Sequence, residues 1–289
     1  MNDRALAVVR AGSLTTVQDR GRFGHAHLGV PRSGALDAPA AALVNRLVGN
    51  SPDAAVLETT LDGCALRPRS TVSVAVGGAP CPVTVDGRPA AWGAPLRVPA
   101  GAVLDIGRAV AGVRTYVAVG GGVAVEPVLG SRSTDLLSGL GPAPLAVGAV
   151  LPVGDARAPH ARVDVAPQPA PPTELVLRVT PGPRDDWFTP ESVRTFLTRA
   201  YRVSPTSNRI GLRTEGPALT RARTGELASE GTVLGAVQVP PDGHPVVFLA
   251  DHPTTGGYPV VAVVHSADLA AAAQAAPGTP LRFTARGRR

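Results

Sequence analysis

The sequence predicts a mainly β protein of the barrel or sandwich class with a few short helices. Short apolar runs rich in β-branched residues recur along the chain, and 33 glycines and 30 prolines divide the 289 residues into many short elements. Helical periodicity is found in three places only. Many strands with few helices argue against a doubly wound sheet, in which strands and helices alternate.

The expected strands share short runs of valine, leucine, isoleucine and other apolar residues. They fall into two groups separated by a proline-rich stretch. The first group is 5–10, 72–76, 82–85, 103–106 and 113–119, and the second is 174–180, 246–250, 260–265 and 281–284.

Three segments carry helix signals. A first helix is expected over 39–48, because its apolar residues fall on one face. Asp37 or Ala38 precedes its first residue. A second helix is expected after Thr189, which is a favourable N-cap because a proline follows it at the first helical position. A third is expected over 266–276, with Ser266 as its cap and a Pro-Gly pair after its end.

The segment 156–173 is the best candidate for a linker because proline recurs in it without a long apolar period. A chain of this length forms one large domain or two of ordinary size. We therefore predict a first β domain over 1–160 and a second over 161–289, with the proline-rich stretch at its start.

Composition predicts a cytoplasmic protein. The N-terminus lacks the apolar region and cleavage site of a signal peptide, and no apolar run reaches the roughly 20 residues that span a bilayer. The two cysteines, Cys64 and Cys81, are expected to be reduced and to act as small core residues.

The basic residues exclude several functions. All 28 are arginines scattered along the chain, and aromatic residues make up only 3%, too few for base stacking, so neither nucleic acid nor a membrane is an expected partner. Without lysine the chain cannot form a Schiff base, supply a phosphate-loop lysine or carry covalent biotin. Any ATP chemistry or biotin carrier must come from another polypeptide, which fits one component of a larger complex.

Two loops are candidates for a small-molecule site. The segments 15–37 and 238–259 place charged and hydroxyl side chains between glycines, next to strand-like runs. Glycine permits a positive φ and a close backbone approach, and loops held by a rigid sheet often carry binding residues. Tight turns in a glycine-rich barrel are the alternative for either loop alone.

Asp251 follows an apolar strand and is the candidate general base. The residues after it have hydroxyl groups and exposed N–H groups that suit an oxyanion. This predicted catalytic set includes Thr254, Thr255, Gly256 and Gly257. An Asx turn at Asp251 is the structural alternative.

Glu230 and Glu58 are acidic residues in apolar, strand-forming surroundings. Such carboxylates either pair with arginine or have a raised pKa. Arg209 and Arg22 are the expected partners, or they clamp a substrate carboxylate through the guanidinium fork. Glu230 joins the predicted catalytic set, although a purely structural Glu–Arg pair is equally consistent with the pattern.

Metal and hydrolase signatures are weak. His25 and His27 share a strand-like face but have no third ligand at metal spacing, so no metal site is predicted. No Gly-x-Ser-x-Gly nucleophile elbow is present, and Ser131, Ser133 and Thr134 are better interpreted as a loop of hydrogen-bond donors.

Several motifs together resemble the biotin-dependent carboxyltransferase-like family. That family includes the C subunit of prokaryotic 5-oxoprolinase, the second subunit of allophanate-hydrolase-like proteins and the carboxyltransferase part of urea carboxylase. The resemblance covers the chain from about residue 5 to about residue 284. The motifs are TVQDRGR (16–22), GVPRSGALD (29–37), LGSRSTD (129–135), PGPRDDWF (181–188), GAVQVP (235–240) and DHPTTGGYP (251–259).

The resemblance implies two cyclophilin-like β-barrel domains and an activity on a small amide. The expected function is that of one subunit in an ATP-dependent 5-oxoprolinase complex, which acts with its A and B sister subunits and receives ATP through the complex. Carboxyl transfer to urea-like amides is one alternative, and a regulatory module that antagonises a kinase inhibitor is another. The predicted substrate-binding residues are Arg22, Ser33, Asp37, Arg209, Gln238 and Tyr258.

Overall fold

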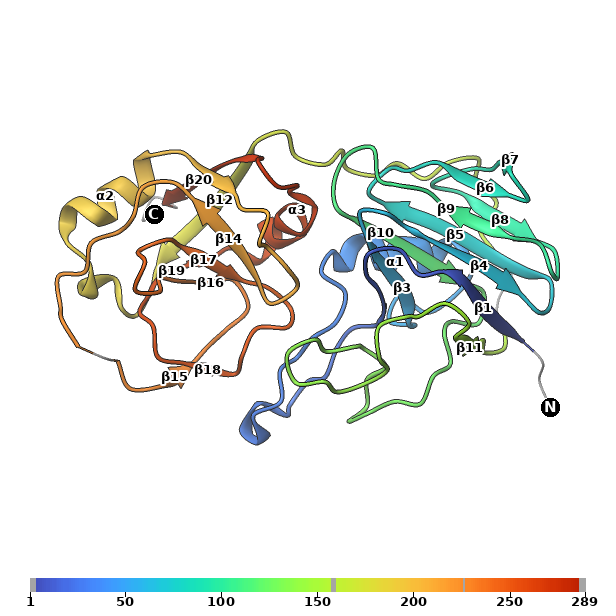
Figure 1. Cartoon of the computed structure of the whole chain (residues 1–289), viewed down its shortest axis with the longest axis horizontal. Helices are drawn as coiled ribbons and strands as arrows, with labels where there is room; N and C mark the ends of the chain where they lie inside the picture. The colour runs from blue at the N-terminus through green and yellow to red at the C-terminus, as the bar shows by residue number, and fades with distance from the viewer. Residues whose placement is uncertain (1–3, 157–159, 226, 286–289) are drawn as a thin grey trace. The chain divides into compact units, whose positions relative to one another are not determined.

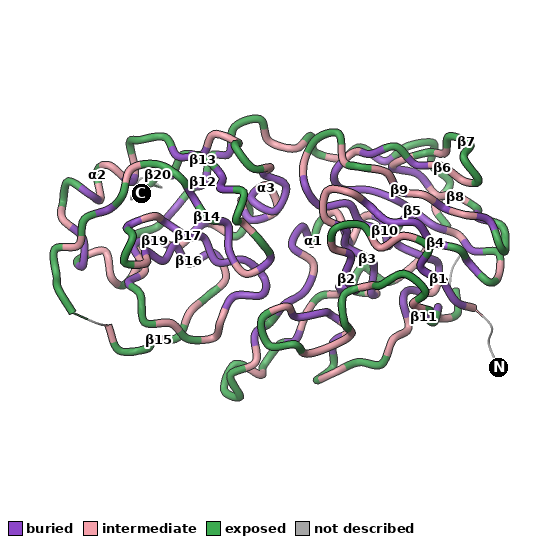
Figure 2. The backbone as a smooth tube through the Cα atoms, in the orientation of Figure 1, coloured by how far each residue is buried: buried purple, intermediate pink, exposed green. Residues whose placement is uncertain are grey.

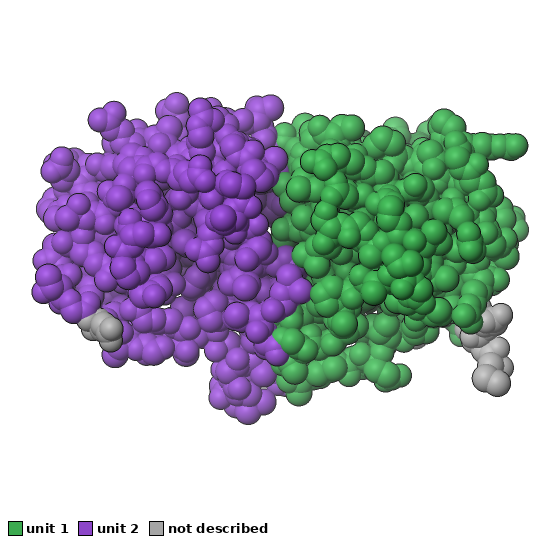
Figure 3. Space-filling model, in the orientation of Figure 1, with its two compact units in different colours: residues 1–22, 33–135, 139–171 green, residues 23–32, 136–138, 172–289 purple. Residues whose placement is uncertain are grey.

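β-Strands dominate the computed structural model, which describes residues 4–156, 160–225 and 227–285 (Figure 1). The predicted mainly β class with few short helices is confirmed. The chain divides into two compact units (Figure 3). Unit 1 comprises residues 1–22, 33–135 and 139–171, and unit 2 comprises residues 23–32, 136–138 and 172–289.

Unit 1 contains two sheets in which all paired strands are antiparallel. The six-stranded sheet has the order β11 (Val150–Pro152), β1 (Ala5–Arg10), β4 (Cys64–Pro68), β9 (Leu104–Ile106), β6 (Val83–Val85) and β7 (Arg88–Pro89). The five-stranded sheet has the order β2 (Thr15–Gln18), β3 (Val56–Thr60), β10 (Arg114–Val119), β5 (Val72–Gly78) and β8 (Pro95–Val98).

The central strand of the five-stranded sheet, β10, is buried along its whole length (Figure 2). Successive side chains of a strand point to opposite faces. Val117 and Val119 enter the core shared by the two sheets, whereas Tyr116 and Ala118 pack in a second cluster beside helix α1 (Ala38–Leu47). The second face therefore brings polar groups of β3 and β10 close to the start of α1.

Helix α1 begins as its sequence predicts. The Asp37 carboxylate accepts a hydrogen bond from the Ala40 N–H at 3.1 Å, which satisfies one of the free donors of the first turn. Val44 and Leu47 are buried against the five-stranded sheet. The predicted helix at 39–48 is confirmed.

Unit 2 is built on a closed barrel of seven strands. Its core includes Phe283, which stacks on Phe196 and meets Tyr201 edge-on. The barrel order is β12 (Leu175–Pro181), β19 (Val260–Val264), β16 (Ala236–Gln238), β17 (Val246–Phe248), β14 (Gly211–Glu215), β13 (Tyr201–Val203) and β20 (Pro280–Ala285), and β12 and β20 close it as a parallel pair.

Short elements flank the barrel. Helix α2 (Pro190–Thr198) begins at Thr189, whose side chain accepts from the Ser192 N–H, as predicted. The expected helix at 266–276 is instead a 3-10 turn, η3 (Ser266–Asp268), followed by α3 (Leu269–Gln274), and Ser266 makes no cap. Asp268, at the N-cap of α3, makes no capping hydrogen bond, and its carboxylate binds the main-chain N–H and the guanidinium of Arg178.

The predicted barrel closure holds for one unit only. In unit 1 the edge strands of each sheet have no strand partner on their outer side within the described residues, so the two sheets remain open and share a core. A cyclophilin-like character of either unit stays a prediction.

Residues 160–171 of the proline-rich segment belong to unit 1. The Ala166 N–H donates to the Gly93 carbonyl at 2.7 Å, and the Gln168 side chain accepts from the Gly78 N–H at 2.7 Å. Residues 157–159 of this segment lie outside the described residues, and the predicted domain boundary at 160/161 stays a prediction. Among the described residues, no helix combines the length and apolar character needed to cross a bilayer.

Candidate functional site

A fully buried ion pair joins Arg209 and Asp251 in unit 2. Asp251 follows β17 by three residues, and its carboxylate oxygens accept from Nε and Nη2 of Arg209 at 2.9 Å each. Both side chains have zero exposure, and the Leu136 N–H adds a longer contact of 3.3 Å to Asp251 Oδ2. The pair is bidentate, which is the geometry in which guanidinium and carboxylate bind most strongly.

This geometry corrects one expectation for Arg209. Its carboxylate partner in the same unit is Asp251, not Glu230. Because the guanidinium engages both oxygens of Asp251, the pair supports a structural role in shaping the loop after β17. The assignment of Asp251 as a general base and of Arg209 as a substrate clamp stays a prediction.

Glu230 lies in the short strand β15 (Glu230–Gly231), which pairs with β18 (Thr255–Gly256). Arg184 binds it through two nitrogens, with Nε at 3.0 Å from Oε2. This hydrogen bonding lowers the pKa of the Glu230 carboxyl below its ordinary value of 4.5. The two side chains are 36% and 33% exposed, so this pair, unlike Arg209–Asp251, is accessible to solvent.

Gln238 and the loop after Asp251 lie next to Glu230 and its strand β15. Gln238 Nε2 donates to the Tyr258 carbonyl at 3.0 Å, and a Cβ added to Gly256 would lie only 2.7 Å from that nitrogen. A side chain at Gly256 would therefore displace Gln238. Thr255 is exposed on β18, and the Thr254 carbonyl accepts from the Thr232 N–H.

Neither Gly256 nor Gly257 has a φ in the left-handed region. The requirement for glycine at 256 comes from close packing instead. The structure thus brings together Arg184 and four of the predicted site residues, namely Glu230, Thr255, Gly256 and Gln238. The side chain of Tyr258, another predicted site residue, is 45% exposed.

Unit 1 contains a second buried polar cluster around Glu58. Its carboxylate accepts from the Tyr116 hydroxyl at 2.8 Å and from the Leu36 N–H at 2.9 Å. The Tyr116 oxygen accepts in turn from the Asp37 N–H at 2.7 Å. Burial, followed by the nearby Glu58 charge, holds the pKa of Tyr116 well above its ordinary value. Glu58 and Asp37 therefore tie the end of the 15–37 loop to the sheet and to α1.

Arg22 is buried and donates to main-chain carbonyls. Its Nε lies 3.1 Å from the Val128 oxygen, and its Nη2 lies 2.5 Å from the Ser133 oxygen. Ser33 has a φ of 55° and donates through its hydroxyl to the Thr134 oxygen at 2.9 Å. Both side chains thus fasten the 15–37 loop to the 129–135 loop, and their proposed contact with substrate stays a prediction.

Asp19 was not among the predicted site residues, although it organises this same region. Its carboxylate accepts from the hydroxyls of Ser131 and Ser133 at 2.6 and 2.7 Å. It also accepts from the N–H groups of Gly21 at 2.8 Å and Arg132 at 2.6 Å. The motifs TVQDRGR and LGSRSTD contain these groups, but the sequence does not indicate that they meet. Arg184 was missed for the same reason, although its motif was recognised.

The cysteines are core residues, as predicted. Cys64 and Cys81 are both free and buried, and burial raises the pKa of their thiols to about 12 and about 11. No group of three or more potential metal ligands occurs among the described residues. His25 precedes a short 3-10 turn, η1 (Ala26–Leu28), and His27 lies within it, so neither histidine is in a strand.

With this fold and these clusters in place, the chain belongs to the carboxyltransferase domain family, subdomains A and B, whose pattern matches residues 28–285. The resemblance indicated by the motifs is therefore confirmed. The chain is 38% identical to the C subunit of 5-oxoprolinase from Escherichia coli, over 96% of this chain and 90% of that protein.

Two solved structures have the same fold. The protein TTHA0988 superposes with a TM-score of 0.88 at 40% identity and covers 97% of this chain, which spans 56% of that chain. The K. lactis urea amidolyase superposes with a TM-score of 0.88 at 31% identity and covers 96% of this chain, which spans only 18% of the amidolyase. In both solved structures the fold is therefore one part of a longer chain, about half of TTHA0988 and less than a fifth of the urea amidolyase.

Proposed function

We propose that this chain is the C subunit of a 5-oxoprolinase complex, which opens 5-oxoproline to glutamate at the expense of ATP together with its A and B sister subunits. The observation that carries this proposal is the near end-to-end similarity to the C subunit of the Escherichia coli 5-oxoprolinase, which includes 90% of that protein. By contrast, the chain corresponds to 18% of the K. lactis urea amidolyase.

The chemistry explains why such a complex uses ATP. The lactam carbonyl is stabilised by resonance with its nitrogen, and phosphorylation of its oxygen makes the carbon a better electrophile. One water adds to this carbon and the C–N bond breaks, with a proton going to nitrogen. A second water balances the release of phosphate, so that 5-oxoproline, ATP and two waters give glutamate, ADP and phosphate. Because this chain has no lysine, a phosphate-loop lysine must come from a sister subunit.

We assign substrate contact in unit 2 to the Arg184–Glu230 pair and its neighbours. The pair is partly exposed, and it adjoins Gln238 and Gly256. A guanidinium suits the substrate carboxylate, and an ionised carboxylate suits the lactam N–H. In this assignment Thr254, Thr255 and Gly257 supply hydroxyl and N–H donors. The buried Arg209–Asp251 pair fixes the loop that carries them.

The assignment is tested by Arg184→Gln in the reconstituted complex. Loss of a charge-assisted contact lowers kcat/KM about 10- to 100-fold, the range for a hydrogen bond to a charged group. The matched control is Arg223→Gln, which removes an exposed pair with Asp186 and leaves kcat/KM unchanged. Equal effects of the two substitutions would contradict substrate contact at Arg184.

Carboxyl transfer is the second candidate, favoured by the superposition on the K. lactis urea amidolyase. In that function the chain moves a carboxyl group between carboxybiotin on a partner and urea or a similar amide. The same purified material distinguishes the two. Urea-stimulated decay of carboxybiotin without ATP-dependent release of glutamate from 5-oxoproline supports carboxyl transfer, and the reverse result supports 5-oxoprolinase.

A further inference from the structure

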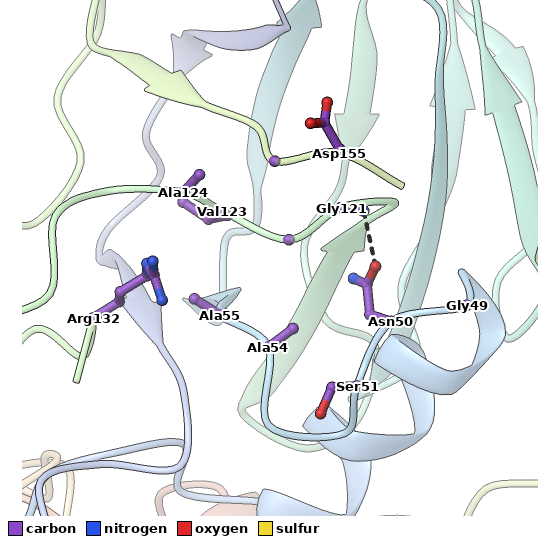
Figure 4. A pocket seen from close by; sticks show the side chains of 12 residues that line it. Gly49, Asn50, Ser51, Ala54, Ala55, Gly121, Val123, Ala124, Arg132 and Asp155 are labelled. Carbon is purple, nitrogen blue, oxygen red and sulfur yellow. Dashed lines mark hydrogen bonds between the residues drawn. The ribbon is translucent and has the colours of Figure 1, made fainter. Parts of the chain in front are cut away.

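Unit 1 contains a cavity of about 400 Å³ that the proposed function does not use (Figure 4). It lies beyond the end of α1, and the turn after β10 and the residues after β11 form its other walls. Its volume is in the range of small-molecule sites, roughly 300–1,000 Å³.

Three glycines give one wall its shape. A Cβ on Gly121 would overlap the Gly154 carbonyl oxygen, and a Cβ on Gly154 would lie 2.5 Å from the Gly121 oxygen. Gly122 has a φ of 73°, in the region that side chains disfavour. The Asn50 amide fixes this wall, since it accepts from the Gly121 N–H and donates to the Val119 oxygen, both at 2.8 Å. The wall is therefore held in place by hydrogen bonds before any ligand binds.

Arg132 enters the cavity from the 129–135 loop. Its N–H is bound by Asp19 at 2.6 Å, and its Nε donates to the Val125 oxygen at 2.7 Å. Those two bonds fix the backbone and the inner part of the guanidinium. Figure 4 shows the guanidinium end of Arg132 directed toward the other lining residues. Within the described part of the chain, neither Nη1 nor Nη2 of Arg132 makes a hydrogen bond or ion pair.

We propose that this cavity binds a small monocarboxylate, held by the two outer nitrogens of Arg132. A guanidinium matches the two oxygens of a carboxylate, and here it is already oriented by its other bonds. Among the described residues that line the cavity, Arg132 is the only cationic side chain and Asp155 the only acidic one. One guanidinium beside one carboxylate suits a monoanion better than a phosphate dianion, because a second negative charge on the ligand would be repelled by Asp155 without a further cation to balance it. Ala54, Val123 and Ala124 offer apolar surface for a short carbon body.

The proposal is tested by NMR titration of the purified full-length chain, with the Gly121 and Gly122 amides as reporters. The probes are acetate and L-5-oxoproline, with neutral 2-pyrrolidinone and inorganic phosphate for comparison. We expect saturable shifts with both carboxylates and none with 2-pyrrolidinone. Absence of saturable shifts, or phosphate binding as tight as acetate binding, overturns the proposal.

Variants locate the binding. Arg132→Gln should weaken carboxylate binding at least about tenfold, the lower range for losing a charge-assisted hydrogen bond. Ala54→Leu fills the cavity without touching Arg132 and should have a similar effect, which keeps the test valid if Arg132→Gln disturbs folding. Arg88→Gln, on the exposed strand β7, is the matched control and should bind as the original chain does. Unchanged affinity in Arg132→Gln or Ala54→Leu contradicts the site.

Discussion

The guanidinium of Arg209 holds both carboxylate oxygens of Asp251 at 2.9 Å, and neither side chain is exposed to solvent. A buried ion pair is costly to break, because removing one partner leaves an uncompensated charge in the protein interior. The pair links Arg209, just before β14, to Asp251 in the loop after β17, and the two residues are 42 positions apart in sequence.

Asp251→Asn is therefore expected to reduce stability as well as turnover. The amide keeps the shape of the side chain but leaves the Arg209 charge unbalanced, so the free energy of unfolding should fall by about 3–5 kcal/mol. Urea denaturation measures this loss. Asp164→Asn, at an exposed position, is the control and should change little. A double variant, Arg209→Met with Asp251→Leu, should recover part of the loss. A stable Asp251→Asn chain with reduced turnover would instead favour the general base.

Tyr116→Phe tests the buried cluster around Glu58. The substitution removes the hydroxyl that donates to Glu58 and leaves the Asp37 N–H without its acceptor, both in the interior. The expected loss is about 1–3 kcal/mol of unfolding free energy, the cost of leaving a buried polar group unsatisfied. Tyr258→Phe, on a side chain that is 45% exposed, is the matched control. Equal stability of the two variants would show that the Glu58 cluster contributes nothing.

Asp19→Asn should loosen the contact between the 15–37 and 129–135 loops. Its carboxylate accepts four hydrogen bonds, and an amide oxygen cannot accept all of them. The amide hydrogens of Gly21 and Arg132 are expected to exchange at least about tenfold faster, because a hydrogen bond to a charged group contributes about 1.5–3 kcal/mol. Asp53→Asn, in a long surface pair with Arg20, should leave both rates unchanged. Unaltered exchange in Asp19→Asn would contradict the role of Asp19.

Glu230 should titrate below its ordinary pKa of 4.5 because Arg184 stabilises its ionised form. A carboxyl whose folded pKa is lowered contributes stability above its unfolded pKa, and this contribution is lost as pH falls through the folded value. NMR titration of the Glu230 carboxyl should give a midpoint below 4.5. In Arg184→Gln the midpoint should rise, while in Arg223→Gln it should not. An unchanged midpoint in Arg184→Gln would show that the ion pair does not form in solution.

Nine of the twenty strands in the described residues were predicted, because their apolar, β-branched signals are local. All nine predicted strands coincide with observed ones to within two residues at each end. Strands such as β3 and β14 were missed because they include polar or charged side chains such as Glu58 and Arg213. The closure of unit 2 through the parallel pair of β12 and β20 depends on segments more than 100 residues apart, which no local pattern encodes.

The candidate site was predictable in its members but not in its pairings. Glu230 and Gly256 were both predicted and lie opposite each other in β15 and β18. The arginine that binds Glu230 is Arg184, at a separation of 46 residues, and choosing it among many arginines requires the fold. Asp19 shows the same limit, since its hydroxyl partners Ser131 and Ser133 lie more than 110 residues away.

The most direct test of the 5-oxoprolinase proposal is the release of glutamate from 5-oxoproline by the reconstituted complex, measured with and without this chain. We expect glutamate and ADP in equal amounts, formed only when this chain, both sister subunits and ATP are present. This chain alone should hydrolyse no ATP. Glutamate release at the same rate without this chain, or substrate-stimulated ATP hydrolysis by this chain alone, would contradict the proposed function.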